Sequence, residues 1–229
     1  LPEHLFIWHA RAACGPRGRR SVARMSVDER RRALIESAFR VIADHGVEGA
    51  TTRRICAHAG MPLASFHYAF ESRTALLSAV METAVPTDIT EMLQSVMHDS
   101  GGDDSDQKRL GMQENMERQL TTFYDLVKAD PGRTQATISL GIYAHNHPEL
   151  QSFGKRMYQK QFEIASVALQ SAAERSGVHW LAPVETLGPI VIAGTNSITL
   201  IYLSTADDEV IRTVITAVVR SLMTYVAED

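Results

Sequence analysis

The 229-residue chain has few of the residues that mark several common protein classes. It contains two cysteines, Cys14 and Cys56, which are too few for a disulfide scaffold and favour a reducing, cytoplasmic location. It has no GxSxG, HExxH or glycine-rich phosphate loop, so the sequence predicts no enzyme, no cofactor and no bound metal. No stretch shows the alternating pattern of a half-buried β-strand.

Two groups of polar residues suggest metal binding but lack the spacing that it requires. His145 and His147 are two positions apart, so they point to different sides of a helix. The acidic segment 99–106 lacks the EF-hand spacing and its final glutamate. We therefore expect a solvated loop at 99–106.

Charge is distributed unevenly along the chain. Residues 1–81 carry 12 arginines, no lysine and 7 acidic residues, a net charge of +5, whereas residues 82–229 carry a net charge of −9. This asymmetry favours a nucleic-acid partner for the N-terminal part, although it is weak evidence by itself.

Residues 186–206 contain no charged side chain, which is long enough for a membrane helix. Pro189, Gly194 and Asn196 interrupt the segment and no basic cluster flanks it, so a buried helix at a protein interface fits better and no membrane partner is expected. At the N-terminus the arginines follow the short apolar run, unlike those of a signal peptide. Residues 1–25 are predicted to be an extension or a flexible basic arm.

Helical signals dominate from Ser26 onward and predict an all-α fold. Ser26 and Glu29 have the spacing of a capping box, and Gly46 supplies a helix stop. Ser72 is the expected cap of a long helix, and the polar segment 98–107 is the expected loop after it. The nine predicted helices cover about 26–46, 51–60, 63–69, 73–97, 108–129, 133–146, 149–176, 184–205 and 207–226.

Residues 51–70 are predicted to form two short helices that cross closely. Cys56 is small and Gly60 permits a tight turn, as the crossing requires. The apolar wedge of this pair consists of Ile55, Ala59, Met61 and Phe66. The pattern fits a helix-turn-helix, in which the second helix enters the major groove of DNA, but spacing alone leaves an ordinary helical hairpin open.

Segment 51–80 resembles the DNA-binding segment of the TetR/AcrR family of bacterial transcriptional regulators, and the likeness is strong over about residues 28–81. The matching positions are Thr51, Ile55, Ala59, Gly60, Phe66, Tyr68, Phe70, Ser72 and Leu76. Cys56, Pro62, His67, Ala69 and Arg73 depart from the family pattern. The resemblance implies a three-helix DNA-binding domain at 26–72 and a larger helical effector-binding and dimerisation domain at 73–229.

By this resemblance we expect a homodimeric repressor that binds a palindromic operator in double-stranded DNA and is released by a small apolar effector. The expected phosphate contacts are Thr51, Ser65, His67, Tyr68 and Arg73; the expected base-edge contacts are Leu63 and Ala64; and Arg30 and Arg31 are expected to reach the adjacent DNA backbone. Arg17, Arg19, Arg20 and Arg24 form either a minor-groove arm or a solvated tail. The alternative function is a helical adaptor that binds a protein through the 51–70 face.

Two further sets of residues are predicted in the C-terminal part. The candidate effector pocket consists of Met112, Met116, Gln119, Phe123, Tyr143, His145, Phe153, Met157 and Gln161, each of which also suits a plain core or surface position. The last two helices are apolar on most faces, which favours burial in a four-helix dimer interface or within a monomeric bundle. The candidate interface residues are Ile190, Ala193, Gly194, Ser197, Ile201, Ile215, Val219 and Leu222.

Overall fold

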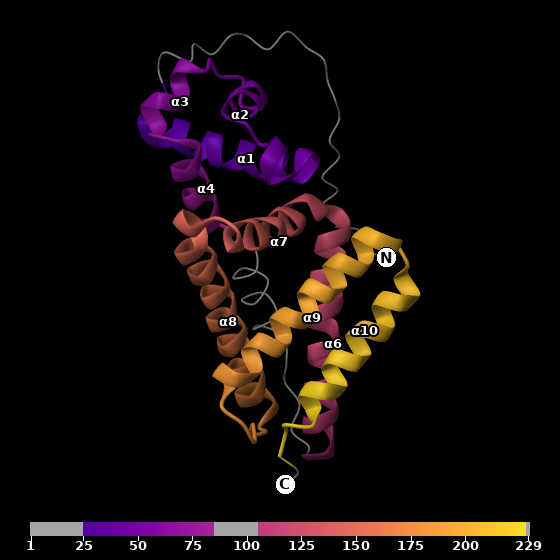
Figure 1. Cartoon of the computed structure of the whole chain (residues 1–229). Helices are drawn as coiled ribbons and strands as arrows, with labels where there is room; N and C mark the ends of the chain where they lie inside the picture. The colour runs from indigo at the N-terminus through magenta and orange to yellow at the C-terminus, as the bar shows by residue number, and fades with distance from the viewer. Residues whose placement is uncertain (1–24, 85–104, 228–229) are drawn as a thin grey trace.

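The computed structural model of the protein describes residues 25–84 and 105–227 (Figure 1). The described N-terminal segment forms α1 (Val27–Gly49), α2 (Thr52–His58), α3 (Ala64–Ala69) and α4 (Arg73–Glu82). The described C-terminal segment forms α6 (Ser105–Ala129), α7 (Pro131–His145), α8 (Pro148–Ser176), α9 (Val184–Thr205) and α10 (Asp208–Met223). Within these ranges the fold is all-α, as predicted, with an isolated β-bridge between Trp180 and Val226.

The predicted capping box at the start of α1 is confirmed. The Ser26 hydroxyl accepts a hydrogen bond from the Glu29 backbone N–H at 3.2 Å, and the Ser26 N–H donates to the Glu29 carboxylate at 2.8 Å. The Ser26 N–H, together with the Ser26 hydroxyl that donates to the same carboxylate at 3.0 Å, holds the pKa of the Glu29 carboxyl below its usual value. The predicted stop is confirmed as well, because Gly46 has a φ of 69° and kinks the chain before Val47.

The predicted helix from Arg73 to Met97 is wrong, because α4 ends at Glu82. The Thr83 hydroxyl donates back to the carbonyls of Ala79 and Val80 at 3.0 and 3.1 Å, which satisfies groups at the helix end. Pro86 has no N–H to donate to the Glu82 carbonyl, so the sequence itself opposes continuation. The expected loop at 98–107 is also too long, since α6 begins at Ser105; its earlier residues lie outside the described ranges.

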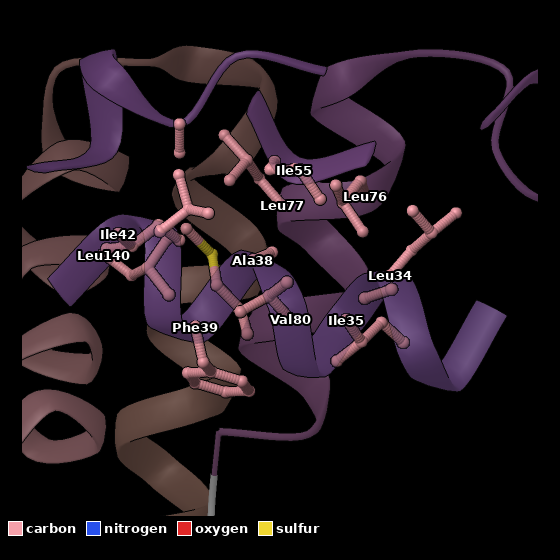
Figure 2. Close-up of a cluster of buried hydrophobic side chains, with 14 of the residues drawn as sticks. Leu34, Ile35, Ala38, Phe39, Ile42, Ile55, Leu76, Leu77, Val80 and Leu140 are labelled. Atoms are coloured by element: carbon pink, nitrogen blue, oxygen red, sulfur yellow. The ribbon is translucent and has the colours of Figure 1, made fainter. Parts of the chain in front are cut away.

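The first hydrophobic core joins α1–α4 to α7 and α8. Leu34, Ile55 and Leu76 are fully buried in it, and Leu140 of α7 belongs to the same cluster (Figure 2). Met157 of α8 closes the cluster from the C-terminal part. The core therefore extends across the predicted domain boundary after residue 72, and that division stays a prediction.

The second core lies among α6, α8, α9 and α10, with Met112, Ile198, Ile211 and Val219 fully buried. In Figure 1 these helices extend away from α7, while α1–α4 occupy the opposite side of α7. The α9–α10 contact is close at Gly194, where an added Cβ would lie 2.9 Å from the Val218 side chain. The molecule thus has two helical ends that meet along α7.

Among the described helices, α9 alone has the length and hydropathy to cross a membrane. It packs against α8 and α10 and contributes Leu187, Ile198 and Thr199 to the protein interior. A large part of α9 is nevertheless exposed in the single chain.

Candidate DNA-binding surface and ligand cavity

The crossing of α2 and α3 is built as the sequence predicts. Ile55, Cys56 and Phe66 are buried, and the Met61 N–H donates to the Cys56 carbonyl at 2.9 Å. Gly60, between the helices, has a φ of 66°, the left-handed conformation that glycine adopts without strain. Burial raises the pKa of the Cys56 thiol, so this cysteine is a neutral packing residue. The rigid crossing fixes the outward face of α3.

The exposed face of α3 carries most of the predicted contact residues. Leu63 is 42% exposed and Tyr68 is 72% exposed, and Ala64 and His67 are exposed beside them. Ser65 is buried at 6% exposure, so it does not belong to this exposed face, and its phosphate contact stays a prediction that the structure does not support.

The N-terminus of α2 lies on the exposed surface as well. Thr51 caps the helix by accepting the Arg54 N–H at 3.3 Å, and its hydroxyl proton remains available to a phosphate. Arg53 is exposed on the first turn and was not among the predicted contacts. Its position two residues after an N-cap threonine is the sequence signal that could have identified it. Arg54 instead bonds the Gly49 carbonyl at 2.6 Å.

Arg30 and Arg31 of α1 lie beside α3, but both make contacts within the protein. Arg31 donates to the Ala69 carbonyl at 3.0 Å and lies over the Phe70 ring. Arg30 donates to the Met25 carbonyl at 3.3 Å, and its guanidinium is 5.8 Å from the Tyr68 ring centroid. Arg31 therefore holds the end of α3 in place, and both arginines add positive charge beside this helix.

Arg73 is half-buried and its donors are bonded within the protein, so the structure gives no support to the expected phosphate contact, which stays a prediction. Its guanidinium donates to the carbonyls of Ala50, at 2.9 Å, and Val47, and to the Tyr143 hydroxyl at 3.2 Å. Arg73 therefore ties the turn that precedes Thr51 to α7. The four arginines of the possible N-terminal arm, at 17, 19, 20 and 24, lie outside the described residues.

A cavity of about 270 Å³ lies among α6, α7, α8 and α9. Three predicted pocket residues line it, namely Gln119, Phe123 and Gln161. Most of the other lining side chains are apolar or threonine, including Ala165 and Ala168 on α8. These small residues follow Gln161 on the same helical face, and their spacing is the signal that could have located the cavity wall.

The other six predicted pocket residues do not line this cavity. Met112 and Met116 are buried in the second core, and Met157 is buried in the first core. Tyr143 and Phe153 pack against the first core, and His145 is exposed at the end of α7. Large apolar side chains fill space tightly, so they mark cores more often than cavities.

Most predicted dimer-interface residues face their own chain. Ile215, Val219 and Leu222 of α10 are buried in the second core, and Ile190 and Ile201 of α9 pack against it. Gly194 is buried against Val218, so it serves the α9–α10 contact within one chain. Only Ala193 and Ser197 are exposed. The apolar residues of α10 indicated the wrong side of this helix as the dimer interface, because they pack on α6 and α9 of the same chain.

Polar contacts connect α1 with the cavity wall. Arg40 of α1 forms an ion pair with Asp130 at 2.5 Å, which holds the pKa of the Asp130 carboxyl below its usual value. Arg133 of α7 contacts the Glu36 carboxylate at 3.4 Å and the Thr83 carbonyl at 3.5 Å. Asp130 and Arg133 also line the cavity, so the same two residues face both the cavity and the DNA-binding helices.

The sequence model of bacterial regulatory proteins of the tetR family matches residues 34–80, which cover most of α1 and all of α2 and α3. The chain is 26% identical over 152 residues to the HTH-type nicotine-responsive transcriptional repressor HdnoR of Paenarthrobacter nicotinovorans, covering 66% of this chain and 73% of that protein.

Two solved structures have a similar fold. One, assigned to the TetR family and from Mesorhizobium loti, aligns with a TM-score of 0.65 at 14% identity, over 89% of this chain and 100% of the other. The other, the multidrug binding protein EbrR in complex with imidazole, aligns with a TM-score of 0.51 at 23% identity, over 83% and 89% of the two chains.

These matches agree with the exposed α2–α3 face and favour DNA over a protein partner for residues 51–70. They give no support to enzymatic activity, since the family consists of regulators of transcription. The chain therefore carries the DNA-binding domain of the tetR family of bacterial regulatory proteins at residues 34–80, and it is a DNA-binding transcriptional regulator.

Proposed function

We propose that this regulator is a homodimeric repressor that binds a palindromic operator and is released when a small molecule enters the cavity among α6–α9. Thr51, Arg53, His67 and Tyr68 contact DNA phosphates in this proposal, and Leu63 and Ala64 pack on base edges. The exposure of these side chains on one rigid face supports the assignment. A protein that reads chromosomal operators works in the bacterial cytoplasm.

The proposed dimer interface is the outward face of α9 and α10. Exposed uncharged residues recur there on both helices: Ala193, Ser197, Leu200 and Ser204 on α9, and Val210, Ala217 and Ser221 on α10. Leu200 is 49% exposed and Val210 is 41% exposed in the single chain. Two such stripes from each of two chains build a four-helix interface with two-fold symmetry.

The observation that carries the proposed coupling is the double role of Asp130 and Arg133. Each lines the cavity and each contacts α1, the helix that supports α2 and α3. A molecule in the cavity therefore alters the contacts that set the position of the DNA-binding helices. The nicotine-responsive relative and the imidazole-bound EbrR, both of which respond to or hold small molecules, support a ligand-controlled regulator.

Filling the cavity by substitution tests this coupling. Ala168 lines the cavity, so Ala168→Phe places a ring where the ligand would lie. We expect an affinity for a selected operator duplex reduced by about 5- to 150-fold, the range of typical allosteric couplings. Val167→Phe on the same helix is the control, because Val167 is 60% exposed and points away from the interior.

The thermal midpoint of each variant separates coupling from unfolding, and Ala168→Leu provides a smaller filler if the ring is not accommodated. Unchanged operator affinity in a folded Ala168→Phe protein, equal to that of Val167→Phe, would contradict the coupling. The proposed DNA contacts would be untouched by that result.

A further inference from the structure

Two residues of the cavity wall carry a hydrogen-bond donor that has no partner in the described part of the protein. Nε2 of Gln161 and Nε of Arg133 are buried and unpaired. Both residues line the cavity, one from α8 and the other from α7. A buried donor without an acceptor costs about 1–3 kcal/mol, so a bound acceptor would stabilise the protein at these positions.

The guanidinium group of Arg133 makes only long hydrogen bonds within the described residues. Its contacts with the Glu36 carboxylate and the Thr83 carbonyl are 3.4 and 3.5 Å, at the long limit of hydrogen bonding. The guanidinium carbon also lies over the Phe39 ring, 4.6 Å from its centroid. An anion in the cavity can therefore recruit this guanidinium without breaking a short ion pair.

The one carboxylate among the lining residues, in contrast, is already engaged within the protein. Asp130 is the carboxylate in the wall, and it is paired with Arg40 at 2.5 Å. A ligand amine would have to displace Arg40 to reach it. The hydroxyls of Thr137 and Thr199 donate to carbonyls within their own helices at 3.0 and 2.9 Å, so they offer a ligand only acceptor positions.

We infer that the cavity binds a small apolar molecule bearing a carboxylate or an equivalent anionic acceptor, with Gln161 and Arg133 as the groups that recognise the acceptor. The inference rests on the proposed ligand-responsive function and names its ligand class. The cavity volume of about 270 Å³ is close to the lower limit of ordinary small-molecule sites, so the ligand is compact.

The same geometry links ligand charge to regulation. When the carboxylate engages Arg133, the guanidinium leaves Glu36 on α1 and the carbonyl at the end of α4. An apolar molecule of equal size without an acceptor displaces the cavity wall but does not compete with Glu36 and Thr83 for the guanidinium. The anionic group therefore adds affinity and strengthens the release of α1 from α7.

Two pairs of probes that differ in charge and share their apolar part test the inference on the full-length protein. The pairs are octanoate with octylamine, and 4-phenylbutyrate with 4-phenylbutylamine, each titrated by calorimetry. We expect at least one carboxylate to bind about tenfold more tightly than its amine. Gln161→Met removes the donor at similar volume and should reduce carboxylate affinity about tenfold while changing amine affinity little.

Gln159→Met is the matched control, because Gln159 is exposed two residues away on the same helix and does not line the cavity. Amines that bind more tightly than both carboxylates would overturn the ligand class, as would carboxylate affinity that is equal in Gln161→Met and Gln159→Met. The absence of binding by all four probes would also overturn it. Operator binding, measured on the same samples, shows separately whether the protein is a DNA-binding regulator.

Discussion

Tyr68 and Phe66, two aromatic residues on α3, should respond differently to replacement by alanine. The change at Tyr68 should weaken DNA binding, whereas the change at Phe66 should destabilise the fold. Tyr68 is 72% exposed, and its recorded contact is a cation–π approach of Arg30 at 5.8 Å, near the outer limit of such interactions. Tyr68→Ala should therefore change the free energy of unfolding by about 0.5 kcal/mol or less. Loss of one phosphate contact should weaken operator binding by about 1–2 kcal/mol, or roughly 5- to 30-fold.

Phe66 is 1% exposed and sits in the first core, where its ring is 5.9 Å from that of Phe70. Phe66→Ala should cost about 3–5 kcal/mol, a large share of the stability of an ordinary domain. Denaturant unfolding and fluorescence anisotropy with a selected duplex at fixed salt measure the two effects. Ile142→Ala, 64% exposed on α7, is the control for losing an exposed side chain.

The reasoning would be refuted if Tyr68→Ala lost several kcal/mol of stability, or if its operator affinity equalled that of Ile142→Ala. The first result would mean that Tyr68 supports the domain; the second would remove it from the DNA contacts.

Two further predictions concern the C-terminal helices. Leu200→Asp places a charge in the proposed α9–α10 interface and should weaken the dimer by about 3 kcal/mol, or more than a hundredfold, in sedimentation; a dimer as tight as the unaltered one would mean that this face is not the interface. The Tyr124 hydroxyl donates to the Asp208 carboxylate at 2.5 Å, and burial together with this bond raises the pKa of Tyr124 to about 12. Since the pKa in the unfolded chain is about 10, this stabilisation is complete below pH 10 and is lost as the pH rises from 10 to 12. Tyr124→Phe should therefore flatten the fall in unfolding free energy over that interval, and an identical fall in both proteins would contradict the assignment.

Local signals in the sequence predict much of the fold and the helix-turn-helix. The capping box of Ser26 and Glu29 and the turn at Gly60 depend on neighbouring residues alone, so their geometry follows from short-range chemistry. The end of α4 was not predicted because the apolar pattern of the sequence continues past Glu82. The signals against continuation are Thr83, which caps the helix, and Pro86, which has no backbone N–H.

Longer-range contacts explain what the sequence could not predict about the candidate site. In the sequence Arg73 has the pattern of a surface cation. In the fold its guanidinium donates hydrogen bonds to the Val47 and Ala50 carbonyls and to the Tyr143 hydroxyl, groups that only the tertiary structure brings together. Apolar residues occupy nearly every side of α9, so its pattern does not reveal which side meets another chain. The cavity depends on small residues such as Ala168, and large apolar residues were a poor guide to it.

The most direct test of the central claim is selection of bound duplexes from a random DNA pool by the full-length protein. A homodimeric reader predicts an enriched palindrome whose half-sites lie about one helical turn, roughly 10 base pairs, apart. It also predicts that Tyr68→Ala recovers the same sequence with lower affinity. Failure to enrich any sequence at low salt, or enrichment of a single site without symmetry, would contradict the account.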